Sequence, residues 1–89
     1  MSVRLGGALK EIRIHLCQTN RQSEGVREFI QTCYVNIKKD NPHFPILIRE
    51  CSGVQPVVWA RYERGVERSQ PLTNLPASEV LDTIKKLAK

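Results

Sequence analysis

Residues 9–17 read Leu-Lys-Glu-Ile-Arg-Ile-His-Leu-Cys, and residues 45–51 read Pro-Ile-Leu-Ile-Arg-Glu-Cys. In the first stretch polar and apolar residues alternate, which is the period of two of a strand whose sheet is buried on one face. A strongly helical stretch separates the two segments. A strand, a helix and a second strand in that order form a right-handed crossover, so we expect the two strands to lie parallel and to end at the same edge of one sheet.

Each of these two strands ends in a cysteine. Neighbouring strands lie ~4.8 Å apart, and a disulfide tolerates a Cα separation of roughly 4.4 to 6.8 Å. If the strands are adjacent and in matching register, Cys17 and Cys51 are therefore close enough to form a disulfide. The bridge would close a loop of about 35 residues, which the chain-entropy model values at roughly 3 to 4 kcal/mol. Two free, partly buried thiols are an equally open alternative.

Between the two strands, apolar residues recur at spacings of three and four, which predicts one amphipathic helix. Its N-cap is expected at Ser23, and its end at the basic, turn-forming residues before Pro42. The apolar positions are Val26, Phe29, Ile30, Cys33, Tyr34 and Ile37. On this stripe the thiol of Cys33 is expected to behave as a small buried hydrophobic group.

The second half of the chain predicts a hairpin and another helix. After a loop at residues 52–56, a third strand is expected at 57–62 and a weaker fourth strand at about 66–72, joined by a turn around 63–65. From about Pro76 onward the apolar residues again form a single stripe, typical of an amphipathic helix. They are Ala77, Val80, Leu81, Ile84 and Leu87.

This order of elements predicts an α/β protein with a thioredoxin-like fold. Its four-stranded mixed sheet would have the order 2-1-3-4, with the two main helices packed on one face. The covered face is expected to carry Ile12, Ile14, Leu16, Ile46, Ile48, Val58 and Ala60. The opposite parity of each strand gives the thinly covered face, with Glu11, Arg13, His15, Cys17, Leu47, Arg49, Cys51, Val57, Trp59 and Arg61.

A sheet face that mixes arginines with tryptophan and leucine is better suited to docking than to exposure, because Arg and Trp are enriched among interface anchors. The predicted partner-binding residues are Arg13, Arg49, Trp59 and Arg61. The same arginines and Trp59 also make a modest surface for RNA. However, Trp59 and Tyr62 point to opposite faces by parity, and no RNA-binding signature accompanies them, so a nucleic-acid partner is disfavoured.

The totals limit the class of protein. A chain of 89 residues, 40% hydrophobic and 26% charged, predicts one globular domain over residues 1–89 with a flexible lead-in at 1–8. The net charge of +5 favours acidic protein surfaces, RNA or anionic lipid as partners. The apolar runs fall far short of the ~20 residues needed to cross a bilayer, and the first residues do not resemble a secretory signal, so the chain is expected to be neither membrane-spanning nor secreted.

The residues that most often carry catalysis or bind metals do not form a convincing site. Cys17 begins Cys-Gln-Thr-Asn rather than a Cys-x-x-Cys motif, and no helix N-terminus is expected beside its sulfur to lower the pKa. His15 and His43 fit no usual zinc spacing, and no third ligand converges with them. We therefore expect no catalytic residue, no metal and no cofactor.

Several segments together carry a family resemblance. They are residues 9–17, Asn41-Pro42 with 45–51, Val54-Gln55-Pro56 and Trp59-Ala60-Arg61-Tyr62, continued by Pro71-Leu72 and Asn74. From Leu9 onward, nearly the whole chain resembles the small thioredoxin-like accessory subunit of mitochondrial respiratory complex I, the NADH:ubiquinone oxidoreductase. A more distant likeness is to mitochondrial ribosomal proteins that share this domain.

The resemblance implies a non-catalytic accessory subunit that supports assembly or stability of the matrix arm of complex I. It implies a peripheral position on the matrix side of the mitochondrial inner membrane, beside the large iron–sulfur subunit. It also implies that Cys17 and Cys51 correspond to a pair able to form a redox-sensitive disulfide, and it makes Gln55-Pro56 a candidate cis bond. The alternative functions are a mitochondrial ribosomal protein of the same family and a thiol oxidoreductase.

Overall fold

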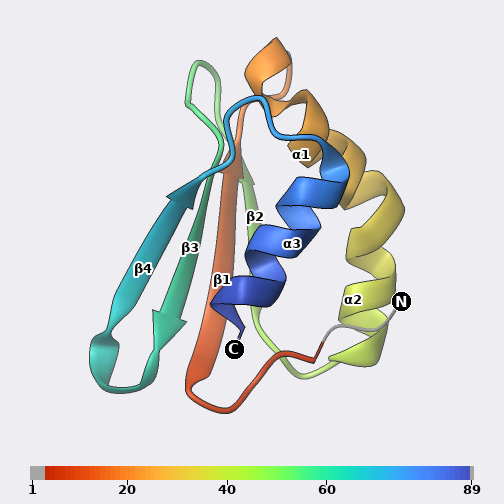
Figure 1. The fold of residues 1–89 in the computed structure, drawn as a ribbon. Coiled ribbons are helices and arrows are strands. Elements are labelled where there is room, and N and C mark those ends of the chain that lie inside the picture. The colour runs from red at the N-terminus through yellow and green to blue at the C-terminus, as the bar shows by residue number, and fades with distance from the viewer. Residues whose placement is uncertain (1–3, 89) are drawn as a thin grey trace.

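The computed structural model describes residues 4–88, which form a four-stranded sheet with helices on one face (Figure 1). The strands are β1 (Leu9–Leu16), β2 (Ile46–Glu50), β3 (Val57–Tyr62) and β4 (Glu67–Pro71). Their order in the sheet is β2-β1-β3-β4, with β2 parallel to β1 and with both β1–β3 and β3–β4 antiparallel. The mixed α/β sheet and its predicted order are confirmed.

Within residues 4–88 the helical layer has three α-helices, α1 (Glu24–Phe29), α2 (Val35–Asp40) and α3 (Ala77–Leu87). A 3₁₀ turn at Arg21–Ser23 precedes α1, and a π-helical turn at Ile30–Tyr34 joins α1 to α2. The predicted helix between the first two strands is confirmed, but the sequence did not predict its π turn. Phe29 and Ile37 are both buried. They are eight residues apart, which is about 2.2 turns of a regular α-helix, so their side chains would not point in the same direction along such a helix. The wider π turn keeps both side chains on the sheet side.

Ser23 does not cap this helix as predicted. Asn20 is the cap, because its Oδ1 accepts a hydrogen bond from the Ser23 N–H at 3.0 Å. The Ser23 hydroxyl faces the other way and accepts from the Cys17 N–H, also at 3.0 Å. Ser23 is fully buried, so it satisfies the backbone where the chain leaves β1, while the residue before the 3₁₀ turn provides the cap.

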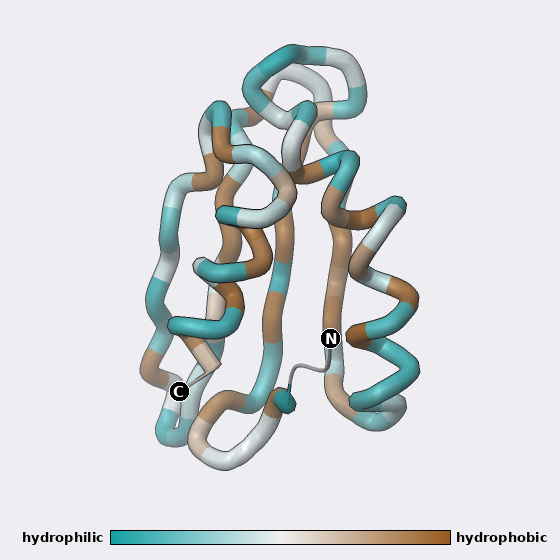
Figure 2. Tube along the Cα trace, turned by 45° about the vertical axis from the view of Figure 1, so that its right-hand side comes forward, coloured by the Kyte–Doolittle hydropathy of each residue, from teal (hydrophilic) through white to brown (hydrophobic). Residues whose placement is uncertain are grey.

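The core lies between the sheet and the helices. Brown and teal segments alternate along the helices in Figure 2, as expected when one stripe faces the sheet. The predicted covered face is confirmed by buried Ile12, Ile14, Leu16, Val58 and Ala60. Ile46 and Ile48 pack against this core but are only partly buried, because β2 is an edge strand. At the end of α3, the Tyr62 hydroxyl donates to the Leu87 carbonyl at 2.6 Å.

Three further predictions concern the N-terminal segment, the Gln55–Pro56 bond and membrane spans. Of the predicted lead-in, residues 1–3 lie outside the described residues; the Leu5 N–H donates to Asn41 Oδ1 at 3.0 Å, and the Leu5 side chain packs against the core. The Gln55–Pro56 peptide bond is trans. Within residues 4–88 no helix combines the length and apolarity needed to cross a membrane.

Candidate functional site

The sheet face opposite the helices presents two cross-strand rows of side chains. Arg13 on β1 lies between Leu47 on β2 and Trp59 on β3, and one step along the strand His15 lies between Arg49 and Val57. We call this surface the open face and define it by Glu11, Arg13, His15, Leu47, Arg49, Val57, Trp59, Arg61 and Glu67. Leu47 is 42% exposed and Trp59 36%, so the face includes large apolar side chains that water reaches.

The open face also separates the two large aromatic residues of β3. Trp59 lies on it, whereas the Tyr62 hydroxyl bonds to α3 on the other side of the sheet. The prediction that these residues lie on opposite faces is confirmed. They therefore do not form the continuous stacking surface that single-stranded nucleic acid uses.

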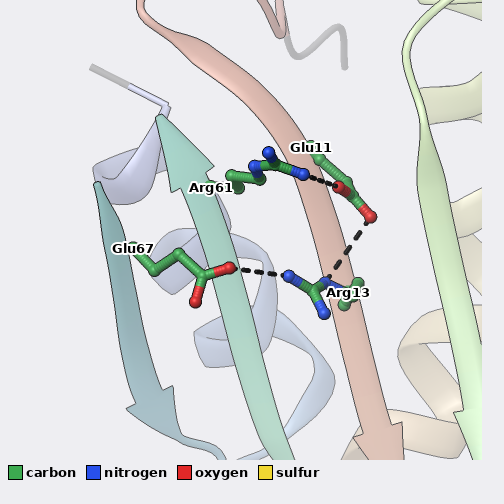
Figure 3. A network of polar contacts seen from close by, with 4 residues as sticks. All are labelled: Glu11, Arg13, Arg61 and Glu67. Atoms are coloured by element: carbon green, nitrogen blue, oxygen red, sulfur yellow. Dashed lines mark hydrogen bonds and ion pairs between the residues drawn. The ribbon is translucent and has the colours of Figure 1, made fainter. Parts of the chain in front are cut away.

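Two of the predicted docking arginines are already paired within the chain (Figure 3). Arg13 Nη2 lies 2.7 Å from Glu67 Oε1, and Arg13 Nε lies 3.5 Å from Glu11 Oε1. Arg61 Nη1 lies 3.8 Å from the other oxygen of Glu11. These side chains are partly to well exposed, and surface ion pairs contribute ~1 kcal/mol or less each. Their main effect here is to fix the side chains and to neutralise the face around β1, β3 and β4.

Arg49 is placed differently from these two arginines. It is exposed, and no acidic side chain within residues 4–88 forms an ion pair with it. Its neighbours on the open face are His15 across the strands and Leu47 on β2 itself. The unneutralised positive charge of the open face is thus concentrated on β2, next to an exposed leucine.

Glu11 is expected on this face from the sequence, but its ion pairs are not, and Glu67 is not among the expected residues. The missing signal was the register of the hairpin, in which Arg61 lies opposite Glu67. Side chains alternate between the two faces of a sheet, and continuing this alternation through the β3–β4 turn would have placed Glu67 on the same face as Arg61.

The cysteines at the strand ends are close in the fold but differ in exposure. The Cys51 N–H donates to the Leu16 carbonyl at 2.9 Å, so the ends of β1 and β2 are adjacent, as predicted. All three cysteines carry free thiols. Cys51 is exposed, but Cys17 is only 3% exposed. Cys17 therefore does not present its sulfur on an open surface as expected, because Thr19, Asn20 and Gly53 surround it.

The surroundings of the Cys17 sulfur favour its thiolate. Backbone N–H groups of Thr19, Gly53 and Asn20 hydrogen-bond to the sulfur and lower the pKa of Cys17 from 9.0 to about 6, against the opposing effect of burial. Arg27 Nη1 holds this turn by donating to the carbonyls of Cys17 and Asn20, each at 2.9 Å. The sequence predicted no helix N-terminus beside this sulfur, and here backbone groups of two turns lower the pKa of Cys17 instead.

The two histidines are not brought together. His15 lies near the end of β1, whereas His43 precedes β2 and so lies toward the other end of the parallel pair. In the described part of the chain, no three metal-ligating side chains form a cluster.

Comparisons with known proteins agree on one family. Residues 26–77 match the family model described as the mitochondrial ribosomal protein L51 / S25 / CI-B8 domain. The chain is 58% identical over 72 residues to the mouse protein named NADH dehydrogenase (ubiquinone) 1 alpha subcomplex subunit 2, covering 81% of this chain and 73% of the mouse protein.

Two further relatives come from a plant and a fungus. The Arabidopsis thaliana protein of the same name is 48% identical over 92% of this chain and 84% of its own length. The Neurospora crassa NADH-ubiquinone oxidoreductase 10.5 kDa subunit is 46% identical over 91% of this chain and 86% of its own length.

Proposed function

The chain belongs to the family of the mitochondrial ribosomal protein L51 / S25 / CI-B8 domain, and on that premise we propose that it is an accessory subunit of mitochondrial complex I. The proposal is supported by three relatives named as subunits of NADH dehydrogenase (ubiquinone) or NADH-ubiquinone oxidoreductase. Its role would be structural and non-catalytic. The family resemblance further supports a position on the matrix side, beside the large iron–sulfur subunit, and a role in assembly or stability of the arm.

The single observation that carries the proposed mode of action is the open face. A small domain that leaves Leu47 and Trp59 exposed beside an unpaired Arg49 has the composition of an interface rather than of an ordinary surface. The complementary surface on a neighbouring subunit would place apolar side chains against Leu47 and Trp59, and a carboxylate near Arg49. Arg61 would lie at the polar rim of this interface, held by Glu11. Arg13 would lie within it, between Leu47 and Trp59, with its charge already balanced by Glu11 and Glu67.

Incorporation into the complex tests this docking. We expect Arg49→Glu combined with Trp59→Ala to reduce the amount of subunit that co-purifies with complex I by about tenfold or more, because interface anchors cost ≥ ~1 to 2 kcal/mol when truncated. The matched control is Lys86→Glu, an exposed charge reversal on α3, on the helical side of the sheet. If the double variant is recovered as well as the control, the open face is not the docking surface.

The same fractionation tests the identity of the assembly. Affinity purification of the tagged wild-type chain from mitochondria, followed by sedimentation, should place it with respiratory-arm subunits. Migration with ribosomal particles would favour the ribosomal branch of the family instead.

We also propose a thioredoxin-like fold with a redox-sensitive pair formed by Cys17 and Cys51. The strand order β2-β1-β3-β4, with α1, α2 and α3 on one face of the sheet, supports the fold assignment. The adjacency of the strand ends supports the pair, as does the hydrogen bond from Gly53, two residues after Cys51, to the Cys17 sulfur.

A disulfide between Cys17 and Cys51 should be detected by mass spectrometry of the folded chain after mild oxidation. Compared with a Cys51→Ser variant under the same conditions, the oxidised protein should be more stable by roughly 3 kcal/mol, because the loop between the cysteines is closed in the unfolded state. Finding only linkages that involve Cys33, or none, would contradict the pairing.

A further inference from the structure

The two edges of the sheet are built differently. β4 is exposed along its whole length and carries Glu67, Arg68 and the edge-blocking Pro71, which are devices that discourage pairing with another strand. β2 has neither proline nor lysine within Ile46–Glu50, and its first three residues are apolar. The hydropathy colours of Figure 2 follow this contrast: the residues of β4 are mostly teal or pale, whereas isoleucine and leucine, the first three residues of β2, are brown.

The hydrogen bonds to β1 show which backbone groups of β2 face outward. The Ile12 N–H donates to the Pro45 carbonyl at 3.1 Å, and the Cys51 N–H donates to the Leu16 carbonyl at 2.9 Å. Odd-numbered residues of β2 therefore direct their N–H and C=O groups toward β1, and the even-numbered residues direct theirs away. Those residues are Ile46, Ile48 and Glu50, and within residues 4–88 no strand other than β1 pairs with β2.

The side chains beside this edge define what fits it. On the open face, Leu47 is 42% exposed and Arg49 has no ion pair within the described chain. On the helical side, Ile46 and Ile48 are partly buried and leave apolar surface at the rim of the core. An extended segment laid along β2 would thus meet main-chain donors and acceptors, an apolar flank and one free cation.

We propose that a neighbouring subunit of complex I adds a β-strand to the β2 edge, with an apolar side chain beside Leu47 and an acidic side chain beside Arg49. The proposal rests on the proposed function and specifies how part of that docking is made. Main-chain hydrogen bonds to Ile46, Ile48 and Glu50 supply attraction that is independent of side chains, while Arg49 sets the preference for an acidic segment.

A second copy of the chain is a poorer occupant of this edge. Each copy carries a net charge of +5, and antiparallel pairing of two β2 strands would bring both Arg49 side chains onto one face without a carboxylate between them. Charge complementarity therefore favours a different, acidic chain.

Amide hydrogen exchange at single-residue resolution tests the proposal on the full chain, first free and then within purified complex I. In the free protein, the N–H groups of Ile46, Ile48 and Glu50 should exchange faster than those of Leu47 and Arg49, which bond to β1. In the complex, the three outward N–H groups should slow by about tenfold or more, as paired strand amides do. Equal exchange rates for these three amides in the free and assembled states would overturn strand addition.

Two substitutions at one position separate the backbone from the side chain. Ile48→Pro removes an outward N–H without removing a bond to β1, and Ile48→Ala removes the same apolar packing but keeps that N–H. We expect incorporation of Ile48→Pro to fall about tenfold below that of Ile48→Ala. If Ile48→Pro does not fold, the hydrogen-exchange measurement on the unmodified protein still shows whether a strand is added at the β2 edge.

The outcomes distinguish this proposal from the docking on which it rests. If Arg49→Glu reduces incorporation while Ile48→Pro and Ile48→Ala behave alike, docking through the open face stands and strand addition is wrong. If neither Arg49→Glu nor Ile48→Pro reduces incorporation, both are wrong. If the free chain sediments as a dimer and its outward amides are already slow, a second copy occupies the edge, and the acidic partner is overturned.

Discussion

At Cys17 the chain leaves β1, and the residues that turn it toward the helix also determine the chemistry of its thiol. Ser23 accepts the hydrogen bond of the Cys17 N–H, and Arg27 donates to the Cys17 carbonyl. The sulfur in turn accepts hydrogen bonds from the backbone of Thr19 and Gly53. Gly53 adopts a φ of 75°, a left-handed conformation that glycine accepts without strain. The low pKa thus comes from two turns that meet, one from each parallel strand.

The stability of the reduced protein should rise with pH through the titration of Cys17. The pKa of this thiol is about 6 when folded and 9.0 as its ordinary value, so between these values the unfolded chain binds more protons. The ionised Cys17 thiol therefore adds most to the free energy of unfolding above pH 9, and this added stability is lost as the pH falls toward 6. Urea unfolding under reducing conditions should show this rise in the wild type and in Cys51→Ser, but a smaller rise in Cys17→Ser.

If stability depends on pH equally in the wild type and in Cys17→Ser, the Cys17 thiol titrates alike in the folded and the unfolded state.

The sequence did not reveal this thiolate, since the motif around Cys17 contains no second cysteine and no helix start. Its stabilising N–H groups come from residues 19, 20 and 53. Only the folded loops bring the last of these to the sulfur, so a local pattern does not predict it.

At the scale of the elements, the alternation of polar and apolar residues along the strands predicted the sheet well. The alternation in residues 9–17 identified β1 and its buried side, and the crossover rule placed β2 beside it in parallel. The helical stripe was found as well, but its π turn was not. Spacings of three and four are satisfied by either form of helix, so packing of Phe29 and Ile37 against one sheet decides the local winding.

Helix α1 and the loop before α3 approach each other more closely than any side chain there would allow. A Cβ atom placed on Gly25 would lie 1.7 Å from the Leu75 carbonyl oxygen and 3.1 Å from Pro76 Cα. These are backbone atoms, so rotating a side chain does not relieve the clash. Gly25 is therefore required by the packing of the two helical segments, although glycine weakens a helix by ~1 kcal/mol relative to alanine.

Gly25→Ala should destabilise the protein by at least about 2 kcal/mol, because the overpacking outweighs the gain in helix propensity. In a domain of this size each kcal/mol lowers Tm by roughly 4 to 8 °C, which thermal unfolding followed by circular dichroism will resolve. Ser78→Ala on the exposed side of α3 is the control and should change stability by less than ~0.5 kcal/mol. A Gly25→Ala variant as stable as this control would show that the loop before α3 yields at little cost.

For the molecule as a whole, the distribution of charge determines which side attracts an acidic surface most strongly. The net charge is +5, but Lys85 and Lys86 lie in the last turn of α3, and Lys38 and Lys39 in the last turn of α2, where cations stabilise the helix dipole. On the open face, Glu11 and Glu67 neutralise Arg13 and Arg61. The excess charge therefore steers approach in general, whereas Arg49 is the cation left to form a specific contact at the interface.

Binding of the isolated chain to complex I that lacks it should therefore weaken as salt is added, and part of that dependence should belong to Arg49. Between about 0.1 M and 1 M salt the Debye length falls from ~10 Å to ~3 Å, so long-range steering is lost while contacts between apolar side chains are retained. Arg49→Gln should flatten the salt dependence of the association rate, measured by surface plasmon resonance. Lys86→Gln removes the same charge from the helical side and should flatten it less. Equal slopes for the two variants would mean that only net charge matters, and that the open face does not orient the encounter.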